Sequence, residues 1–185
     1  ADVVTLEVLN ESDRRQWLAG MRVGFGGRLG EYAPPEADAA LFERFRADRG
    51  VTVVLCPRGV GPDAWAGDER KQTHIRRRFM LLGQTLDGMR VWDVRRAVRA
   101  IGQLEGIDER GLAVRASGNM AGIALYAALF EPGVRRLELT DVPATHAEGP
   151  TLLNVLRYLD VPQALAMAAE YADVEGRGRT RRLSL

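Results

Sequence analysis

Three residues in the second half of the chain have the side chains that nucleophilic catalysis uses. Ser117 follows one apolar run, Asp141 follows the next, and His146 lies five residues after Asp141. A histidine can take the proton of a serine hydroxyl while a carboxylate orients the imidazole, and the serine then attacks an ester. Alternatively, Ser117 is only a small turn residue, and His146 only ties its loop to the backbone near Gly149 and Pro150. The residue types leave both interpretations open.

A second set of residues is suited to binding. Arg58, Asn119 and Met120 come shortly after predicted strands, and they are candidate ligand contacts. Asn119 would either contact a polar group of the ligand or cap a helix. Cys56 is expected to be a small apolar filler, with a reactive thiol as the alternative. Asp93 is expected to pair with a nearby arginine and to fix its helix against a turn.

These residues need strands and helices to bring them together. Runs of apolar and β-branched residues predict strands, and apolar residues at helical spacing predict helices. The predicted strands are residues 3–9, 51–56, 112–116 and 134–140, with 180–185 as a last one. The predicted helices are residues 36–48, 69–104 with a break near 83–88, 120–130, 152–160 and 162–171. Glycines and a Pro-Pro pair predict an irregular loop over residues 10–35, with a short helix around 14–19.

The alternation of strands and helices determines the predicted fold class. Nearly continuous apolar strands, such as VTVVLC at 51–56, are typical of a buried strand in a parallel sheet that is covered on both faces. We therefore predict an α/β fold with three layers: a mostly parallel sheet with helices on both faces. Residues 1–185 form one domain, and residues 174–185 are either a last strand or a mobile basic tail. The site is expected at the carboxyl ends of the strands.

The composition argues against several classes of function. The net charge is +1 and the arginine runs lack interleaved aromatic residues, so we expect no nucleic-acid partner. No apolar run approaches the ~18 residues of a membrane helix, so we expect no membrane partner. Two histidines and one cysteine are too few for a His/Cys zinc site. The glycine-rich residues 24–27 lack a nucleotide-binding motif, and we expect no metal and no cofactor.

Four stretches resemble the core of an α/β-hydrolase, in the branch of bacterial acetyl xylan esterases, dienelactone hydrolases and prolyl-oligopeptidase-like proteins. VVLCPRGVG at 53–61 is similar to the end of the fourth strand of that fold, and GQTLDGMRVWDVRRA at 83–97 to the helix before the nucleophile strand. SGNMAGIALYAAL at 117–129 resembles the nucleophile turn and its helix. HAEGPTLLNVLRYLDVPQALA at 146–166 resembles the segment after the sixth strand. The order and spacing of these stretches imply an α/β-hydrolase fold.

The resemblance also implies that the usual catalytic set is missing. The family holds its serine in a G-x-S-x-G turn between a strand and a helix. The corresponding residues here are Ser117, Asn119 and Ala121, so that an amide takes the place of the nucleophile. The usual acid and histidine follow later strands than this chain contains, and residues 10–14 replace the usual oxyanion loop. The first strands of the fold would lie upstream, in a longer protein.

The leading hypothesis is a hydrolase-like domain, related to carbohydrate esterases, without ester-hydrolase activity. Such a domain would bind a small ester or carbohydrate, or serve a structural role beside other domains of a longer chain or in a homo-oligomer. The parent protein could then be secreted or periplasmic. The alternative is an active serine esterase on acetylated carbohydrate or a similar small ester, using Ser117, His146 and Asp141. A third hypothesis is an anion-binding or nucleic-acid-binding module that uses the arginines.

Overall fold

The computed structural model describes residues 4–48, 50–65, 68–104, 111–177 and 182–184. The strands are β1 (Val4–Val8), β2 (Val51–Leu55), β3 (Leu112–Ser117), β4 (Val134–Thr140), β5 (Asp173–Arg177) and β6 (Arg182–Ser184). The helices are α1 (Glu11–Leu29), α2 (Ala39–Ala47), α3 (Glu69–Leu81), α4 (Leu86–Ile101), α5 (Asn119–Ala128) and α6 (Val161–Ala169). Short 3-10 turns occupy Gly30–Tyr32, Gly61–Asp63 and Val155–Arg157.

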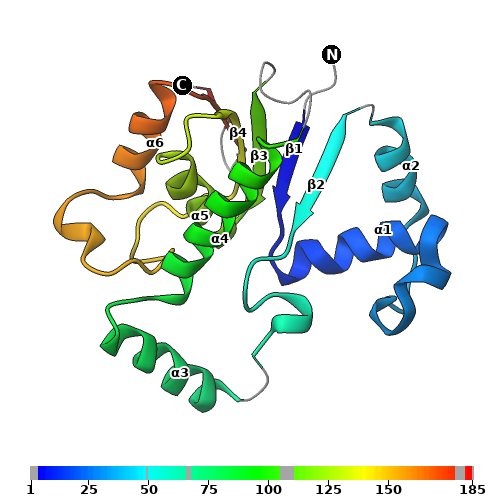
Figure 1. The fold of residues 1–185 in the computed structure, drawn as a ribbon, viewed down its shortest axis with the longest axis horizontal. Coiled ribbons are helices and arrows are strands. Elements are labelled where there is room, and N and C mark those ends of the chain that lie inside the picture. The colour runs from blue at the N-terminus through cyan, green and yellow to red at the C-terminus, as the bar shows by residue number, and fades with distance from the viewer. Residues whose placement is uncertain (1–3, 49, 66–67, 105–110, 178–181, 185) are drawn as a thin grey trace.

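The strands form one sheet in the order β2-β1-β3-β4-β5-β6. Strands β1 to β5 are parallel to their neighbours, and β6 runs antiparallel to β5. Helices lie around this sheet, with α4, α5 and α6 grouped over one face and α1 and α2 beyond the β2 edge (Figure 1). The predicted α/β class with a mostly parallel sheet is therefore confirmed.

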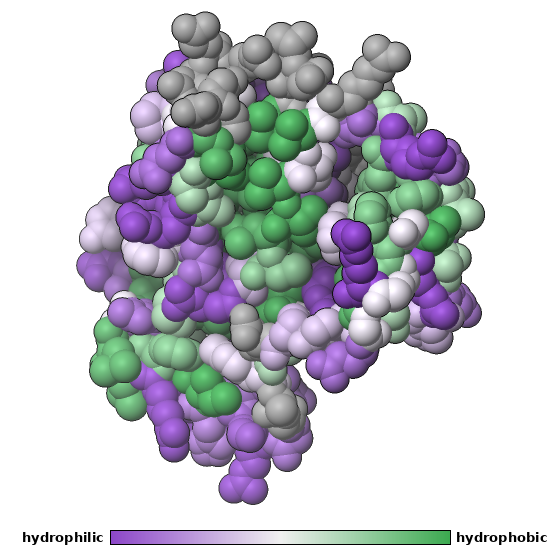
Figure 2. Space-filling view, turned by 45° about the vertical axis from the view of Figure 1, so that its right-hand side comes forward, coloured by the Kyte–Doolittle hydropathy of each residue, from purple (hydrophilic) through white to green (hydrophobic). Residues whose placement is uncertain are grey.

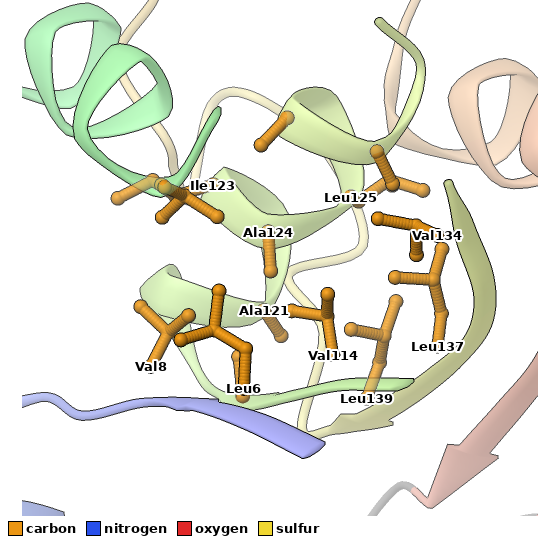
Figure 3. Close-up of a cluster of buried hydrophobic side chains, with 14 of the residues drawn as sticks. Leu6, Val8, Val114, Ala121, Ile123, Ala124, Leu125, Val134, Leu137 and Leu139 are labelled. Atoms are coloured by element: carbon orange, nitrogen blue, oxygen red, sulfur yellow. The ribbon is translucent and has the colours of Figure 1, made fainter. Parts of the chain in front are cut away.

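The core lies between the sheet and helices α4, α5 and α6. Alternate side chains of β1 point into it, and Leu6 is fully buried. Figure 3 shows Leu125 of α5 beside Leu137 of β4, and Ala121 of α5 beside Val114 of β3. Helix α5 is enclosed by the sheet and two helices, and its sequence is therefore apolar on all sides. Each of its buried leucine or isoleucine side chains contributes about 1.5–3 kcal/mol to the stability of the fold. No helix among the described residues is long and apolar enough to cross a membrane.

The predicted irregular loop over residues 10–35 is wrong. Most of this segment forms helix α1, which begins after Asn10, and the side-chain oxygen of Asn10 accepts a hydrogen bond of 2.9 Å from the Asp13 backbone N–H. Two of the glycines that predicted a loop, Gly20 and Gly24, instead let α2 approach closely. A Cβ at Gly20 would lie 2.7 Å from the ring of Phe45. Packing against α2 therefore outweighs the low helix propensity of glycine.

The strand predicted at residues 51–56 is present as β2, but the prediction that it is buried is wrong. Strand β2 is an edge of the sheet, so that Val51 is 52% exposed and Cys56 is exposed as well. Figure 2 looks toward this side of the molecule and shows apolar side chains gathered in its middle. Partial desolvation raises the pKa of the Cys56 thiol. Cys56 is therefore neither a buried filler nor a thiol activated by a lowered pKa.

The segment before α6 also differs from the prediction. Residues 152–160 contain only the 3-10 turn at Val155–Arg157 instead of a helix. Helix α6 begins at Val161, where Asp160 and Gln163 form a capping box. Such reciprocal capping satisfies two otherwise unpaired N–H groups and fixes the helix start.

The sheet extends further than the sequence predicts. Asp173–Arg177 forms the fifth parallel strand, paired with β4, and Arg182–Ser184 forms the antiparallel sixth. Of residues 174–185, which the sequence leaves as a last strand or a mobile tail, 174–177 lie in β5 and 182–184 form β6. Residues 178–181 and 185 lie outside the described part. Pairing with β4 decides the state of β5, because its sequence DVEGR has only one β-branched residue.

Candidate functional site

The carboxyl ends of the parallel strands lie along one edge of the sheet. There β1 leads to Asn10, β3 ends at Ser117 and β4 leads to Asp141. Two clefts lie beside the sheet and reach residues at this edge. Each is assembled from segments that are distant in the sequence.

The turn between β3 and α5 has its apex at Gly118. Gly118 has φ 55° and ψ −132°, and it is the N-cap of α5 without a side-chain capping bond. Only glycine adopts this conformation readily. Asn119 is the first helical residue, so the prediction that Asn119 caps the helix is wrong. The residue at the sharpest point of the turn therefore has no side chain.

Ser117 is bound to the start of α1. Its hydroxyl donates to Asp13 Oδ2 at 2.5 Å and accepts a hydrogen bond from Asn10 Nδ2 at 2.9 Å. Asn10 also caps α1. These contacts join the ends of β1 and β3, which are paired neighbours in the sheet. Ser117 thus has a carboxylate and an amide as partners, not an imidazole.

His146 is buried in the loop after β4. Its Nδ1 lies 2.7 Å from the carbonyl oxygen of Pro150, and its Nε2 lies 2.7 Å from the hydroxyl of Tyr126 on α5. Because a carbonyl oxygen only accepts, Nδ1 donates to Pro150, and Nε2 shares the second hydrogen bond with the Tyr126 hydroxyl. Burial, with a smaller contribution from Asp160, raises the pKa of Tyr126 to about 12. Both ring nitrogens of His146 are therefore occupied by the loop and by α5.

The remaining sequence candidates differ in position. Asp141 is exposed and has a positive φ of 49°. Met120 is 3% exposed and belongs to the core, and it lines neither of the two clefts. The hydrogen bonds of Ser117 and His146 do not join these two residues.

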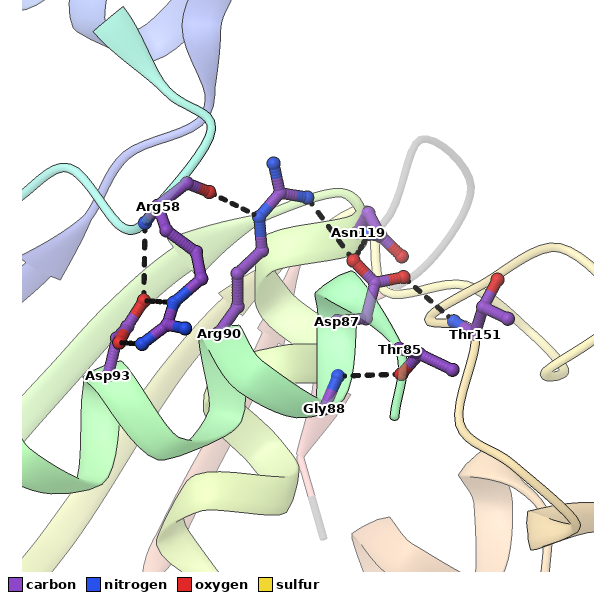
Figure 4. A network of polar contacts seen from close by, with 8 residues as sticks. All are labelled: Arg58, Thr85, Asp87, Gly88, Arg90, Asp93, Asn119 and Thr151. Atoms are coloured by element: carbon purple, nitrogen blue, oxygen red, sulfur yellow. Dashed lines mark hydrogen bonds and ion pairs between the residues drawn. The ribbon is translucent and has the colours of Figure 1, made fainter. Parts of the chain in front are cut away.

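Asn119 takes part in a polar network around Asp87, near the start of α4. Asp87 Oδ1 accepts hydrogen bonds from Arg90 Nη1 at 3.2 Å and from Asn119 Nδ2 at 3.3 Å. Asp87 Oδ2 accepts one from the backbone N–H of Thr151 at 2.8 Å (Figure 4). Thr85 caps α4 by accepting from the Gly88 N–H. The buried carboxylate thus connects α4, α5 and the loop after β4.

Arg58 is held in place by Asp93 of α4. Its Nε lies 2.8 Å from Asp93 Oδ2, its Nη2 lies 2.5 Å from Oδ1, and its backbone N–H also donates to Oδ2 (Figure 4). Hydrogen bonding to Asp93 raises the pKa of Arg58. The prediction that Asp93 pairs with an arginine and fixes α4 against a turn is confirmed. The carbonyl oxygen of Arg58 accepts from Arg90 Nε at 3.0 Å, which links this pair to the Asp87 network.

A cleft of about 460 Å³ lies beside this network, and we call it the Asn119 cleft. Its charged lining residues are Asp87, Arg90 and Arg76. Its other lining residues are Gly59, Ala64, Trp65, Gln72, Met80, Thr85, Leu86, Asn119 and Thr151. The volume is within the range of small-molecule sites.

A larger cleft of about 690 Å³ lies against the opposite face of the sheet, and we call it the charged-face cleft. Its floor includes Glu7, Arg115, Glu138 and Glu175, which are register partners on β1, β3, β4 and β5. Arg115 Nε pairs with Glu138 Oε2 at 2.8 Å. Burial raises the pKa of Glu7, although Arg115 partly opposes this. This face carries charges where a parallel sheet is usually apolar, and α1 and α2 border it across the cleft.

Among the described residues, no group of three or more His, Cys, Asp or Glu side chains is arranged to hold a metal ion.

Sequence reasoning missed Asp87, Arg90 and Thr151. Asp87 had a usable signal, since an acidic residue in the first turn after Thr85 is typical of a capped helix start. No local signal indicated that Asp87 is a buried hydrogen-bond acceptor, because its donor Thr151 lies 64 residues away. Of the site residues predicted from the sequence, only Asn119 lines the Asn119 cleft. The guanidinium of Arg58 is hydrogen-bonded to Asp93 instead.

The fold has a counterpart among solved structures. No protein-family model and no curated protein matches the sequence. A crystal structure of a proposed acetyl xylan esterase from Bacteroides fragilis superposes with a TM-score of 0.58 at 13% sequence identity. The superposition covers 95% of this chain and 53% of the esterase, so the chain spans about half the length of that protein. The likeness shows that this chain shares the α/β fold of that protein over the superposed part.

Proposed function

We propose that this chain is a hydrolase-like domain, related to carbohydrate esterases, that does not cleave esters through a serine and instead binds a small ligand in the Asn119 cleft. The observation that carries this proposal is the backbone of Gly118. A serine hydrolase presents its nucleophile on a strained turn between a strand and a helix. In this chain the residue with that strained conformation is Gly118 and not Asn119, the position that the family resemblance implied, and a glycine has no side chain to attack an ester.

The environments of the nearest candidates support the same proposal. The Ser117 hydroxyl donates to the carboxylate of Asp13 rather than to a histidine. His146 is 8% exposed and has both ring nitrogens engaged. A serine becomes a strong nucleophile when an adjacent base accepts its proton and is itself oriented by a third group. The imidazole that would accept that proton is committed to Tyr126 and Pro150.

The proposal is tested by labelling the folded protein with a fluorophosphonate serine probe and measuring the intact mass. The wild-type protein and the variants Ser117→Ala and Ser12→Ala are treated in parallel. Ser12 is an exposed serine on α1 and controls for nonspecific labelling. We expect no stoichiometric adduct on any of the three. An adduct that is lost only in Ser117→Ala would refute the proposal and favour an esterase that uses Ser117, His146 and Asp141.

A structural role is the second part of the proposal. Among the described residues β2 pairs only with β1, so Val51 is exposed and the other side of β2 has backbone groups that a further strand could pair with. Other domains of a longer chain, or a second copy of this one, would satisfy that edge. Analytical ultracentrifugation of this chain distinguishes the two, because only self-association raises its sedimenting mass with concentration.

A further inference from the structure

The Asn119 cleft has an excess of positive charge. Arg90 and Arg76 line it, and Asp87 is its only carboxylate among the described residues. Asp87 already accepts hydrogen bonds from Arg90, Asn119 and the Thr151 backbone. Its charge is therefore committed to the internal network, and the formal charge of the lining side chains is positive.

Of the two arginines that line the cleft, Arg90 is the buried one. Its side chain is 12% exposed, its Nε donates to the Arg58 carbonyl and its Nη1 donates to Asp87. Figure 4 marks no hydrogen bond from Nη2 to the other residues drawn there. Burial lowers the pKa of Arg90, and the nearby Asp87 only partly opposes this. A desolvated guanidinium with a spare donor is stabilised by a second anion.

The other lining residues of the cleft indicate what kind of molecule bears the anionic group. Trp65 stacks on Phe79 with ring centroids 5.5 Å apart, and Met80 and Leu86 add apolar surface. Arg76 is exposed on α3, and it brings a second guanidinium to the lining. Guanidinium groups match the planar geometry of a carboxylate, and an aromatic and aliphatic wall suits an organic body.

We infer that the Asn119 cleft binds a small organic carboxylate, with the carboxylate group held by Arg90 and Arg76. This inference rests on the proposed ligand-binding role and names the class of ligand. The organic body lies against Trp65 and Leu86. Neutral sugars and esters lack the charge that the two guanidinium groups favour, and they bind more weakly.

The inference is tested by isothermal titration calorimetry with two matched pairs of probes. Benzoate is compared with neutral benzamide, and glucuronate with neutral glucose. We expect saturable binding of at least one carboxylate and about tenfold weaker binding of its neutral partner, as expected when a charge-assisted hydrogen bond is lost. Binding of inorganic phosphate alone, equal binding of the neutral partners, or no binding of either carboxylate would overturn the inference.

Variants locate the site. Arg76→Gln is exposed and is expected to fold normally while weakening carboxylate binding about tenfold. Arg77→Gln, the neighbouring exposed arginine that does not line the cleft, serves as the matched control and is expected to bind as the wild type does. Equal weakening by both variants, or by neither, would contradict the assignment. Serine labelling reads out the proposed function separately, so the failure of one proposal is distinguishable from the failure of the other.

Discussion

Replacing Gly118 by alanine tests the backbone geometry on which the functional proposal depends. Gly118 has φ 55° and ψ −132°, and a Cβ built there meets no atom within 4 Å. The substitution therefore introduces no clash, and its cost is the strain of an L-residue in that conformation, about 1–3 kcal/mol. Restriction of the unfolded chain offsets about 0.4–1 kcal/mol of this. Gly118→Ala is thus expected to lower the free energy of unfolding by about 1 kcal/mol.

The matched control is Gly133→Ala. A Cβ at Gly133 also meets no atom within 4 Å, but its φ is outside the left-handed region. Alanine there is expected to stabilise the protein by about 0.4–1 kcal/mol, because it restricts the unfolded chain. Urea unfolding followed by circular dichroism measures both variants, and the melting temperature shifts by about 2–4 °C per kcal/mol for a domain of this size. Equal stabilities of the two variants would show that Gly118 is not the strained residue of the turn.

Three further substitutions probe the polar groups of the fold. Tyr126→Phe leaves His146 Nε2 buried without its partner and is expected to lower stability by about 1–3 kcal/mol, measured by urea unfolding against the wild type. Glu131 is 5% exposed. Burial raises its pKa, but hydrogen bonds from two arginines of α4 lower it, and the net pKa lies below 4.5. Its contribution is therefore present above pH 4.5 and lost as the pH falls, so Glu131→Gln should flatten the decrease in stability below that pH. Burial raises the pKa of Glu7 above 4.5. The ionised carboxylate of Glu7 therefore destabilises the folded protein, whereas that of Glu131 stabilises it. Glu7→Gln should stabilise the protein at pH 7 but much less at pH 4, and equal effects at both pH values would contradict the assigned shift.

The candidate site was only partly predictable from the sequence. The SGNMAG stretch and the apolar residues around it correctly place a turn between β3 and α5 at the carboxyl edge of the sheet. The position of the apex was not predictable, because Ser117, Gly118 and Asn119 are all compatible with a tight turn. The hydrogen bond from Ser117 to Asp13 spans 104 residues and fixes which way the hydroxyl points. No local pattern encodes such a contact.

The sequence alone determines the elements whose signals are local. Periodicity places α4 and α5, β-branched runs place β1 and β4, and these alternate in the order of an α/β fold. Polar residues at every second position of VTLEV also mark one face of β1 as charged, although the overall apolar character of the strands obscured this signal.

Tertiary structure decides the rest. Whether VTVVL becomes a central or an edge strand depends on which neighbours pair with it, and β2 has only β1 among the described residues. Whether Gly20 interrupts a helix or lies within one depends on whether Phe45 of α2 packs against it. Whether Asp87 is a surface carboxylate or the centre of a buried network depends on Thr151. The reason is common to all three: local propensities amount to about 1 kcal/mol per residue or less, and long-range packing and hydrogen bonding exceed them.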